Sequence, residues 1–149
     1  MKAIKNFEEF VRNGTVKKQT PDKSRSEFLI KEAHRNYLYL LELIKKMGID
    51  NRNANSYIES CHNILVGLIR AKLLLGGYNA SGFGAHEAEV AYMRNLGFNE
   101  KDVQFADQIR YFRNGIMYYG TSLDKEYAEK AVAFTKINYL KLKKIVEQI

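Results

Sequence analysis

The sequence has one cysteine, one proline and no long apolar run, and each shortage excludes a class of protein. Cys61 alone cannot form an internal disulfide, and among apolar neighbours we expect its thiol to act as a small hydrophobic group. No apolar stretch approaches the roughly 18 residues that a membrane-spanning helix needs. Glu8 and Glu9 stand where a signal peptide would have its apolar core, so we expect a cytoplasmic protein without a membrane partner.

Strand-like alternation is also lacking, and what recurs is the helical period of apolar residues. The sequence therefore predicts an all-α fold, an up-and-down bundle of four main helices plus a short helix. Pro21 is the only proline, and we expect residues 1–21 to form a short helix and a basic connector and residues 22–149 to form the bundle. The expected helices cover about 3–12, 22–47, 53–75, 85–96, 100–119 and 123–147. The glycine-rich stretch 76–84 is predicted as a mobile loop, since it lacks the preceding strand and the Gly-Lys-Ser/Thr ending of a phosphate loop.

The second long helix carries two apolar stripes, and a helix that is apolar on two faces must be covered on two sides. It is either the central helix of the bundle or the helix that forms a dimer. The first stripe is Tyr57, Cys61, Ile64, Leu68, Ala71 and Leu75; the second is Ile58, His62, Leu65, Ile69 and Leu73.

Positive charge exceeds negative charge, with a formal net charge of +7. Residues 1–21 and the far end of the last helix are basic, and only the stretch 78–100 is net acidic. This balance favours polyanionic partners such as RNA, which bind through phosphate contacts. Many basic proteins bind no nucleic acid, so charge alone leaves that alternative open.

The most informative segment is the C-terminal half of the helix at 100–119. On a helical wheel, Arg113 lies about 60° from Ile116 and about 40° from Ile109, at the edge of the apolar stripe. Arg110, Asn114 and Tyr118 follow along the neighbouring edge, and all are groups that can hold a phosphate or a base edge. The alternative is structural, with Arg113 paired to a carboxylate of another helix. Gly115 suggests in addition that another backbone approaches this helix closely.

These residues resemble the HEPN family, helical domains named for higher eukaryotic and prokaryotic nucleotide binding. The family motif is an Arg, usually followed by a polar residue, and then a His near the end of a long helix, and Arg113-Asn114 begins such a motif. The flanking sequence also fits, and the resemblance covers roughly residues 24–147. The fitting segments are Ser60-Cys-His62-Asn-Ile-Leu, Ala71-Lys-Leu-Leu-Leu-Gly-Gly-Tyr78, His86-Glu-Ala-Glu and Leu96-Gly-Phe.

The resemblance implies a homodimer with a central cleft for RNA or a nucleotide. Active members would be metal-independent endoribonucleases in which the RNA 2′-hydroxyl attacks its own phosphodiester. At the position of the motif histidine this chain has Tyr118 or Tyr119, and a tyrosine is a poor general base at neutral pH. We therefore expect binding without full turnover, beside a nucleotidyltransferase or in a toxin–antitoxin pair. The binding residues implied are Arg110, Arg113, Asn114, Tyr118, Tyr119 and His62.

Two alternatives remain. One is a weak endoribonuclease in which Arg113 and Asn114 act with Tyr118 or His62. The other is a structural dimer without a ligand, joined through the second stripe of the helix at 53–76. We expect His62 to be neutral within an interface, His86 to be exposed or at a helix N-terminus, and His34 to be solvated. No spacing of His, Cys, Asp and Glu resembles a metal site, and no cofactor is expected.

Overall fold

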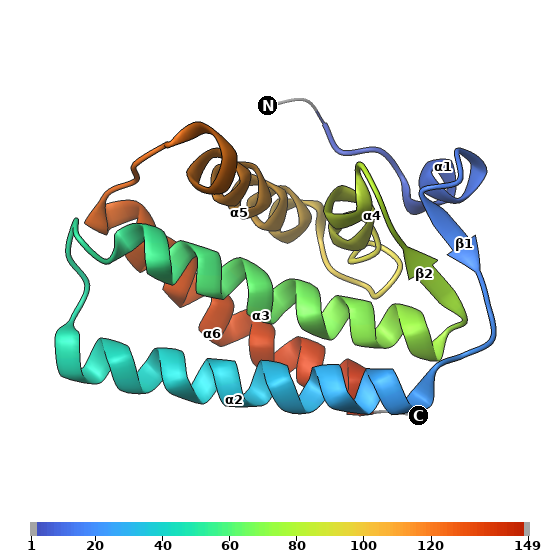
Figure 1. The fold of residues 1–149 in the computed structure, drawn as a ribbon, viewed down its shortest axis with the longest axis horizontal. Helices are drawn as coiled ribbons and strands as arrows, with labels where there is room; N and C mark the ends of the chain where they lie inside the picture. The colour runs from blue at the N-terminus through green and yellow to red at the C-terminus, as the bar shows by residue number, and fades with distance from the viewer. Residues whose placement is uncertain (1–2, 148–149) are drawn as a thin grey trace.

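The computed structural model describes residues 3–147 as a mostly helical protein with one small sheet (Figure 1). The helical class predicted from the periodicity is confirmed. The outer ends of the two predicted regions, residues 1–2 and 148–149, lie outside this range. The elements are α1 (Phe7–Arg12), β1 (Val16–Lys18), α2 (Lys23–Met47), α3 (Ala54–Leu75), β2 (Tyr78–Ala80), α4 (Ala85–Ala91), α5 (Glu100–Tyr119) and α6 (Lys125–Glu147).

The long helices begin and end close to the predicted residues because capping residues in the sequence mark their ends, as α2 illustrates. The Asp22 side chain accepts a hydrogen bond from the Arg25 backbone N–H at the start of α2, and Gly48 ends that helix at φ 68°. The short helices were predicted too long. α1 begins at Phe7, and α4 ends at Ala91, where turns continue to Gly97.

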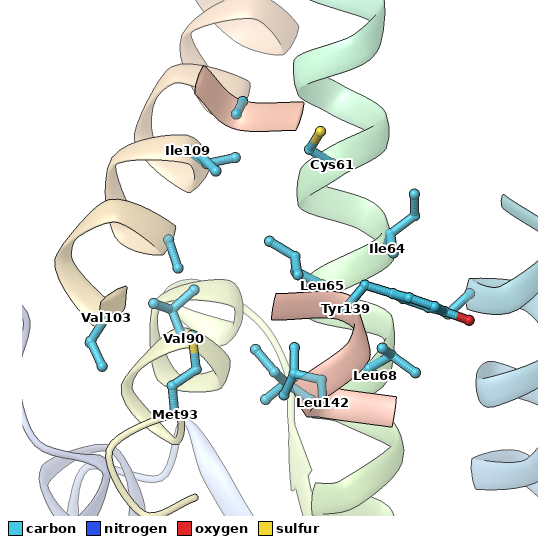
Figure 2. Packing of buried hydrophobic residues seen from close by; sticks show 14 of the residues in the cluster. Cys61, Ile64, Leu65, Leu68, Val90, Met93, Val103, Ile109, Tyr139 and Leu142 are labelled. Carbon is cyan, nitrogen blue, oxygen red and sulfur yellow. The ribbon is translucent and has the colours of Figure 1, made fainter. Parts of the chain in front are cut away.

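Helix α3 is the central helix of the fold (Figures 1 and 2). It packs against α2 and α6, and also against α4 and α5. Nearly all of both predicted stripes is buried, including Cys61 and Leu68 of the first and Ile58 and Ile69 of the second. Burial also raises the pKa of the Cys61 thiol to about 12, as expected of an inert core cysteine. The second stripe is therefore not available as a dimer interface, which corrects the predicted position of that interface.

A two-stranded antiparallel sheet joins β1 to β2, contrary to the prediction of a strand-free chain. Val16 pairs with Ala80 and Lys18 pairs with Tyr78. The whole glycine-rich stretch 76–84 was predicted as a loop, but its residues 78–80 form a strand. The Gln19 backbone N–H donates to the Gly77 carbonyl at 2.8 Å, which extends the pairing of the two segments by one hydrogen bond beyond the strands.

The N-terminal segment packs onto the same core as the bundle. Ile4, Phe7, Phe10 and Val16 are buried within the main apolar cluster. The Arg94 side chain fixes this segment, since it donates to the carbonyls of Ile4 and Lys5 at 2.9 Å each. Within residues 3–147, none of the helices has the length and apolar character needed to cross a bilayer.

Candidate functional site

A cleft of about 920 Å³ lies between the C-terminal half of α5 and the segment that leads into α4. Five of the six predicted binding residues line it, and all five come from α5: Arg110, Arg113, Asn114, Tyr118 and Tyr119. The opposite wall includes Phe83 and His86, which the sequence analysis did not select. The structure therefore brings the predicted α5 residues together around one cavity, beside an aromatic ring and an imidazole.

The end of α5 is shaped by two glycines. Gly120 adopts the left-handed conformation at φ 66°, and the N–H groups of Gly120 and Thr121 both point to the Gly115 carbonyl. A Cβ at Gly115 would lie 2.8 Å from Oγ1 of Thr121. Among residues 3–147, the close approach predicted at Gly115 is made by the Thr121 side chain folding back over the helix, and not by a second backbone.

Arg113 is half-buried, and its guanidinium has no carboxylate partner among the described residues. Its Nε–H is buried without a hydrogen bond, and its one side-chain contact is a long one, 3.4 Å from Nη1 to Oδ1 of Asn114. The alternative in which Arg113 locks the bundle through an ion pair is therefore not seen in residues 3–147. An unpaired charge beside a cleft is costly unless water or an anion contacts it.

Arg110 differs from Arg113 because it is already paired. Its Nε donates to Oδ1 of Asp107 at 2.6 Å, and the Asp107 side chain is almost fully buried. The positive charge of Arg110 is largely compensated within α5. Of the two arginines on this wall, Arg113 is the one whose charge has no carboxylate partner among the described residues.

Tyr118 and Tyr119 project from the last turn of α5 and are largely exposed, at 70% and 83% of their surface. Phe83, across the cleft, is fully exposed. Exposed aromatic rings at the rim of a cleft that also holds the unpaired Arg113 guanidinium are platforms on which nucleobases can stack. Exposed rings that cluster in this way bury no apolar surface in the free protein, which favours a role in binding a ligand.

His62, the sixth predicted residue, does not line the cleft but lies buried on α3. Its ring is 5.2 Å from that of His86, between centroids. Nδ1 contacts Oδ1 of Asn63 at 3.3 Å, and Nε2 is buried without a partner. Burial lowers the pKa of His62 to about 3, the Asn63 contact opposes this, and the nearby charges of His86, Arg113 and Arg110 lower it further. A group with this pKa is a poor general base at neutral pH, so the structure disfavours the ribonuclease that relies on His62.

His86 and Glu89 form a cluster that sequence reasoning missed. The Glu89 carboxylate is completely buried and accepts from Arg70 Nε at 2.6 Å and from Arg70 Nη2 at 3.1 Å. His86 Nδ1 lies 2.9 Å from the same carboxylate. The spacing of His86 and Glu89, three residues apart on a helix, was a usable signal for their contact. The link to Arg70 on α3 depends on tertiary packing.

His34 corrects another prediction. It is half-buried, so it is only partly open to solvent, and its Nδ1 lies 2.8 Å from the hydroxyl of Tyr139. The stacked rings of Tyr37 and Tyr139 lie beside it, with centroids 3.9 Å apart. His34 therefore joins α2 to α6 and is separate from the cleft.

We expect His62 to make the protein less stable in mild acid. Its pKa is about 3 when folded and about 6.5 when unfolded, so below pH 6.5 only the unfolded chain gains the proton. Stability should fall by up to about 1.4 kcal/mol per pH unit, or about 2 kcal/mol between pH 7.5 and pH 5. Urea unfolding at the two pH values measures this, and His62→Gln should remove most of the difference. An equal loss in the variant would show that His62 is not the cause.

The described residues contain no group of three or more His, Cys, Asp or Glu side chains placed to share a metal ion. Comparison of the chain with protein-family models, with curated proteins and with solved structures finds no match. The interpretation of the cleft therefore depends on its own residues.

Proposed function

We propose that this protein binds RNA or a nucleotide in the cleft between α5 and α4, as a HEPN-like helical protein. The observation that carries the proposal is Arg113, a half-buried guanidinium without a carboxylate partner in residues 3–147, with a buried Nε–H that makes no hydrogen bond. A phosphate supplies the negative charge and acceptor oxygens that this group lacks. Asn114 adds an amide beside it.

The rim of the cleft supports the same proposal. Tyr118 and Tyr119 offer exposed rings for stacking, and the net charge of +7 attracts a polyanion. A single-stranded RNA or a nucleotide has both chemical features that the cleft can contact, a phosphate and an aromatic base. Double-stranded nucleic acid keeps its bases stacked, so the exposed tyrosines would have nothing to contact.

The biological setting follows from the resemblance to HEPN domains. We propose a homodimer in which the cleft lies near the two-fold axis, working with a nucleotidyltransferase or as one member of a toxin–antitoxin pair. The motif that supports this is Arg113-Asn114 near the C-terminal end of the long helix α5. Sedimentation of the full chain tests the dimer independently of RNA binding.

Replacing Tyr118 tests the stacking part of the proposal. Base–aromatic stacking contributes about 1–3 kcal/mol per base, so Tyr118→Ala should weaken binding of a short single-stranded RNA by roughly 5- to 150-fold. Fluorescence anisotropy at low salt, where phosphate contacts are strongest, measures the affinity. Tyr39→Ala is the matched control, because Tyr39 is 62% exposed on α2 and does not line the cleft. Equal affinities of both variants would contradict stacking at Tyr118.

A further inference from the structure

A shallow groove lies between α5 and α6, both of which pack against α3 (Figure 1). It consists of two hollows, of about 480 Å³ and about 390 Å³, which adjoin because Asp102 lines both. Phe105 and Phe134 line the first hollow, and Phe98 and Ile145 line the second. No described residue lines both this groove and the cleft between α5 and α4, so the groove is a separate surface.

One wall of the groove is a stripe of exposed α6 residues that continues from the first hollow to the second. Its members recur every three or four residues and lie within about 80° of one another around the helix. They are Lys130, Ala133, Ile137, Lys141 and Lys144. The stripe is about 21 Å long. Ile137, at its centre, is 59% exposed and lies one turn from Ala133 of the first hollow and one turn from Lys141 of the second.

The rim of the groove is positively charged. Lys101 and Lys130 line the first hollow, Lys141 and Lys144 line the second, and Asp102 is the one acid among the residues that line them. Lys130 takes part in an exposed ion pair within α6 at 3.9 Å, and the other three lysines form no salt bridge in residues 3–147. An occupant that complements this groove therefore carries negative charge.

The apolar groups of the groove favour a protein over a nucleic acid. Phe105 and Phe134 are half-buried and pack on each other, with ring centroids 4.7 Å apart, and the exposed Ile137 is aliphatic. Nucleobases bind by stacking on exposed aromatic faces, whereas an amphipathic helix buries its apolar stripe in a groove of this kind. A nucleic acid would contact the lysines and leave Ile137 uncovered.

We propose that the groove between α5 and α6 binds an amphipathic helix of a partner protein, one whose apolar stripe is flanked by acidic residues. The two hollows are related by eleven residues of α6, since Lys130 and Phe134 line the first where Lys141 and Ile145 line the second. Eleven residues make about three helical turns, or about 16 Å. A helix lying along α6 therefore needs apolar residues at i, i+4, i+7 and i+11, with Asp or Glu beside them. The inference goes beyond RNA binding in the cleft and does not depend on it.

The test is binding of a labelled synthetic helix to the full chain, measured by fluorescence anisotropy. The probe has about 18 residues, with leucine at i, i+4, i+7 and i+11, glutamate beside the leucines and alanine elsewhere. A second probe has lysine in place of each glutamate. The acidic probe should bind saturably and lose affinity as salt is added, and the basic probe should bind at least about tenfold more weakly. No saturable binding of the acidic probe, or equal binding of the two, would overturn the proposal.

Variants of exposed residues locate the binding. Ile137→Glu should weaken binding of the acidic probe by roughly tenfold or more, because it removes buried apolar surface and adds a like charge. Leu38→Glu is the matched control, since Leu38 is 51% exposed on α2 and lines neither hollow. Lys141→Glu should also weaken binding, whereas Lys31→Glu, an exposed position on α2, should leave it unchanged. Equal losses at the groove and control positions would overturn the assignment to this groove.

Two other occupants are outcomes of the same experiment. If Ile137→Glu weakens binding of single-stranded RNA and the acidic probe does not bind, then the groove is a nucleic-acid surface and the proposal is wrong. If Ile137→Glu dissociates a dimer of the wild type in sedimentation, then a second copy covers the groove, which also overturns it. Arg113→Ala should leave the affinity for the acidic probe unchanged, so a failure of this proposal is distinguishable from a failure of RNA binding in the cleft.

Discussion

Arg113→Ala is expected to weaken RNA binding by about 10- to 150-fold while leaving the fold intact. Hydrogen bonds to a charged group contribute about 1.5–3 kcal/mol each, and the substitution removes the only guanidinium on the α5 wall that has no carboxylate partner in the described chain. The slope of log affinity against log salt should also decrease in magnitude by about one, because one phosphate contact is lost. Fluorescence anisotropy over a range of salt concentrations measures both quantities.

Arg25→Ala is the control for the loss of one positive charge. Arg25 is exposed on the first turn of α2 and forms no salt bridge among the described residues, so its removal should change RNA affinity by less than about threefold. Similar losses in the two variants would mean that net charge alone attracts RNA and that the cleft has no special role. Both variants should unfold at urea concentrations close to that of the wild type.

The second large effect is expected at Glu89. Glu89→Ala removes the partner of Arg70 inside the protein, and breaking a buried ion pair costs about 3–5 kcal/mol because a charge is left without compensation. The free energy of unfolding, measured with urea, should fall by this amount. Replacing both partners, Arg70→Met with Glu89→Leu, should recover most of the loss, since a well-packed apolar pair needs no compensation.

An exposed ion pair provides the comparison for Glu89. Glu42 lies 2.8 Å from Lys46 on the surface of α2, and pairs of this kind contribute between zero and about 1 kcal/mol. Glu42→Ala should therefore have a small effect. If Glu89→Ala is no more destabilising than Glu42→Ala, then the cluster does not stabilise the fold.

The helical elements could be predicted from the sequence because their signals are local. Asp22 and Gly48 at the two ends of α2, and the two stripes of α3, depend only on residues within a few turns of one another. The sheet could not be predicted in this way. Its strands have three residues each, too few for a periodic pattern, and Val16 pairs with a residue more than sixty positions away.

The candidate site was predictable on one wall only. Arg113 and Tyr118 share a helix, so the angle between their side chains follows from the helical geometry. His86 reaches the cleft through the packing of α4 against α3 and α5, and Glu89 becomes a buried ion-pair partner only when Arg70 arrives from α3. Nothing local in the sequence distinguishes Glu89 from an ordinary exposed helical acid.

The central claim is that the guanidinium of Arg113 contacts the bound RNA. The most direct measurement follows the Arg113 Nε–H signal in a nitrogen–proton correlation spectrum, assigned by its loss in Arg113→Lys, while single-stranded RNA is added. The account predicts a saturable shift of this signal, because the buried Nε–H has no partner within residues 3–147 of the free protein. RNA that binds and shifts other signals, but leaves that of Arg113 unmoved, would contradict it.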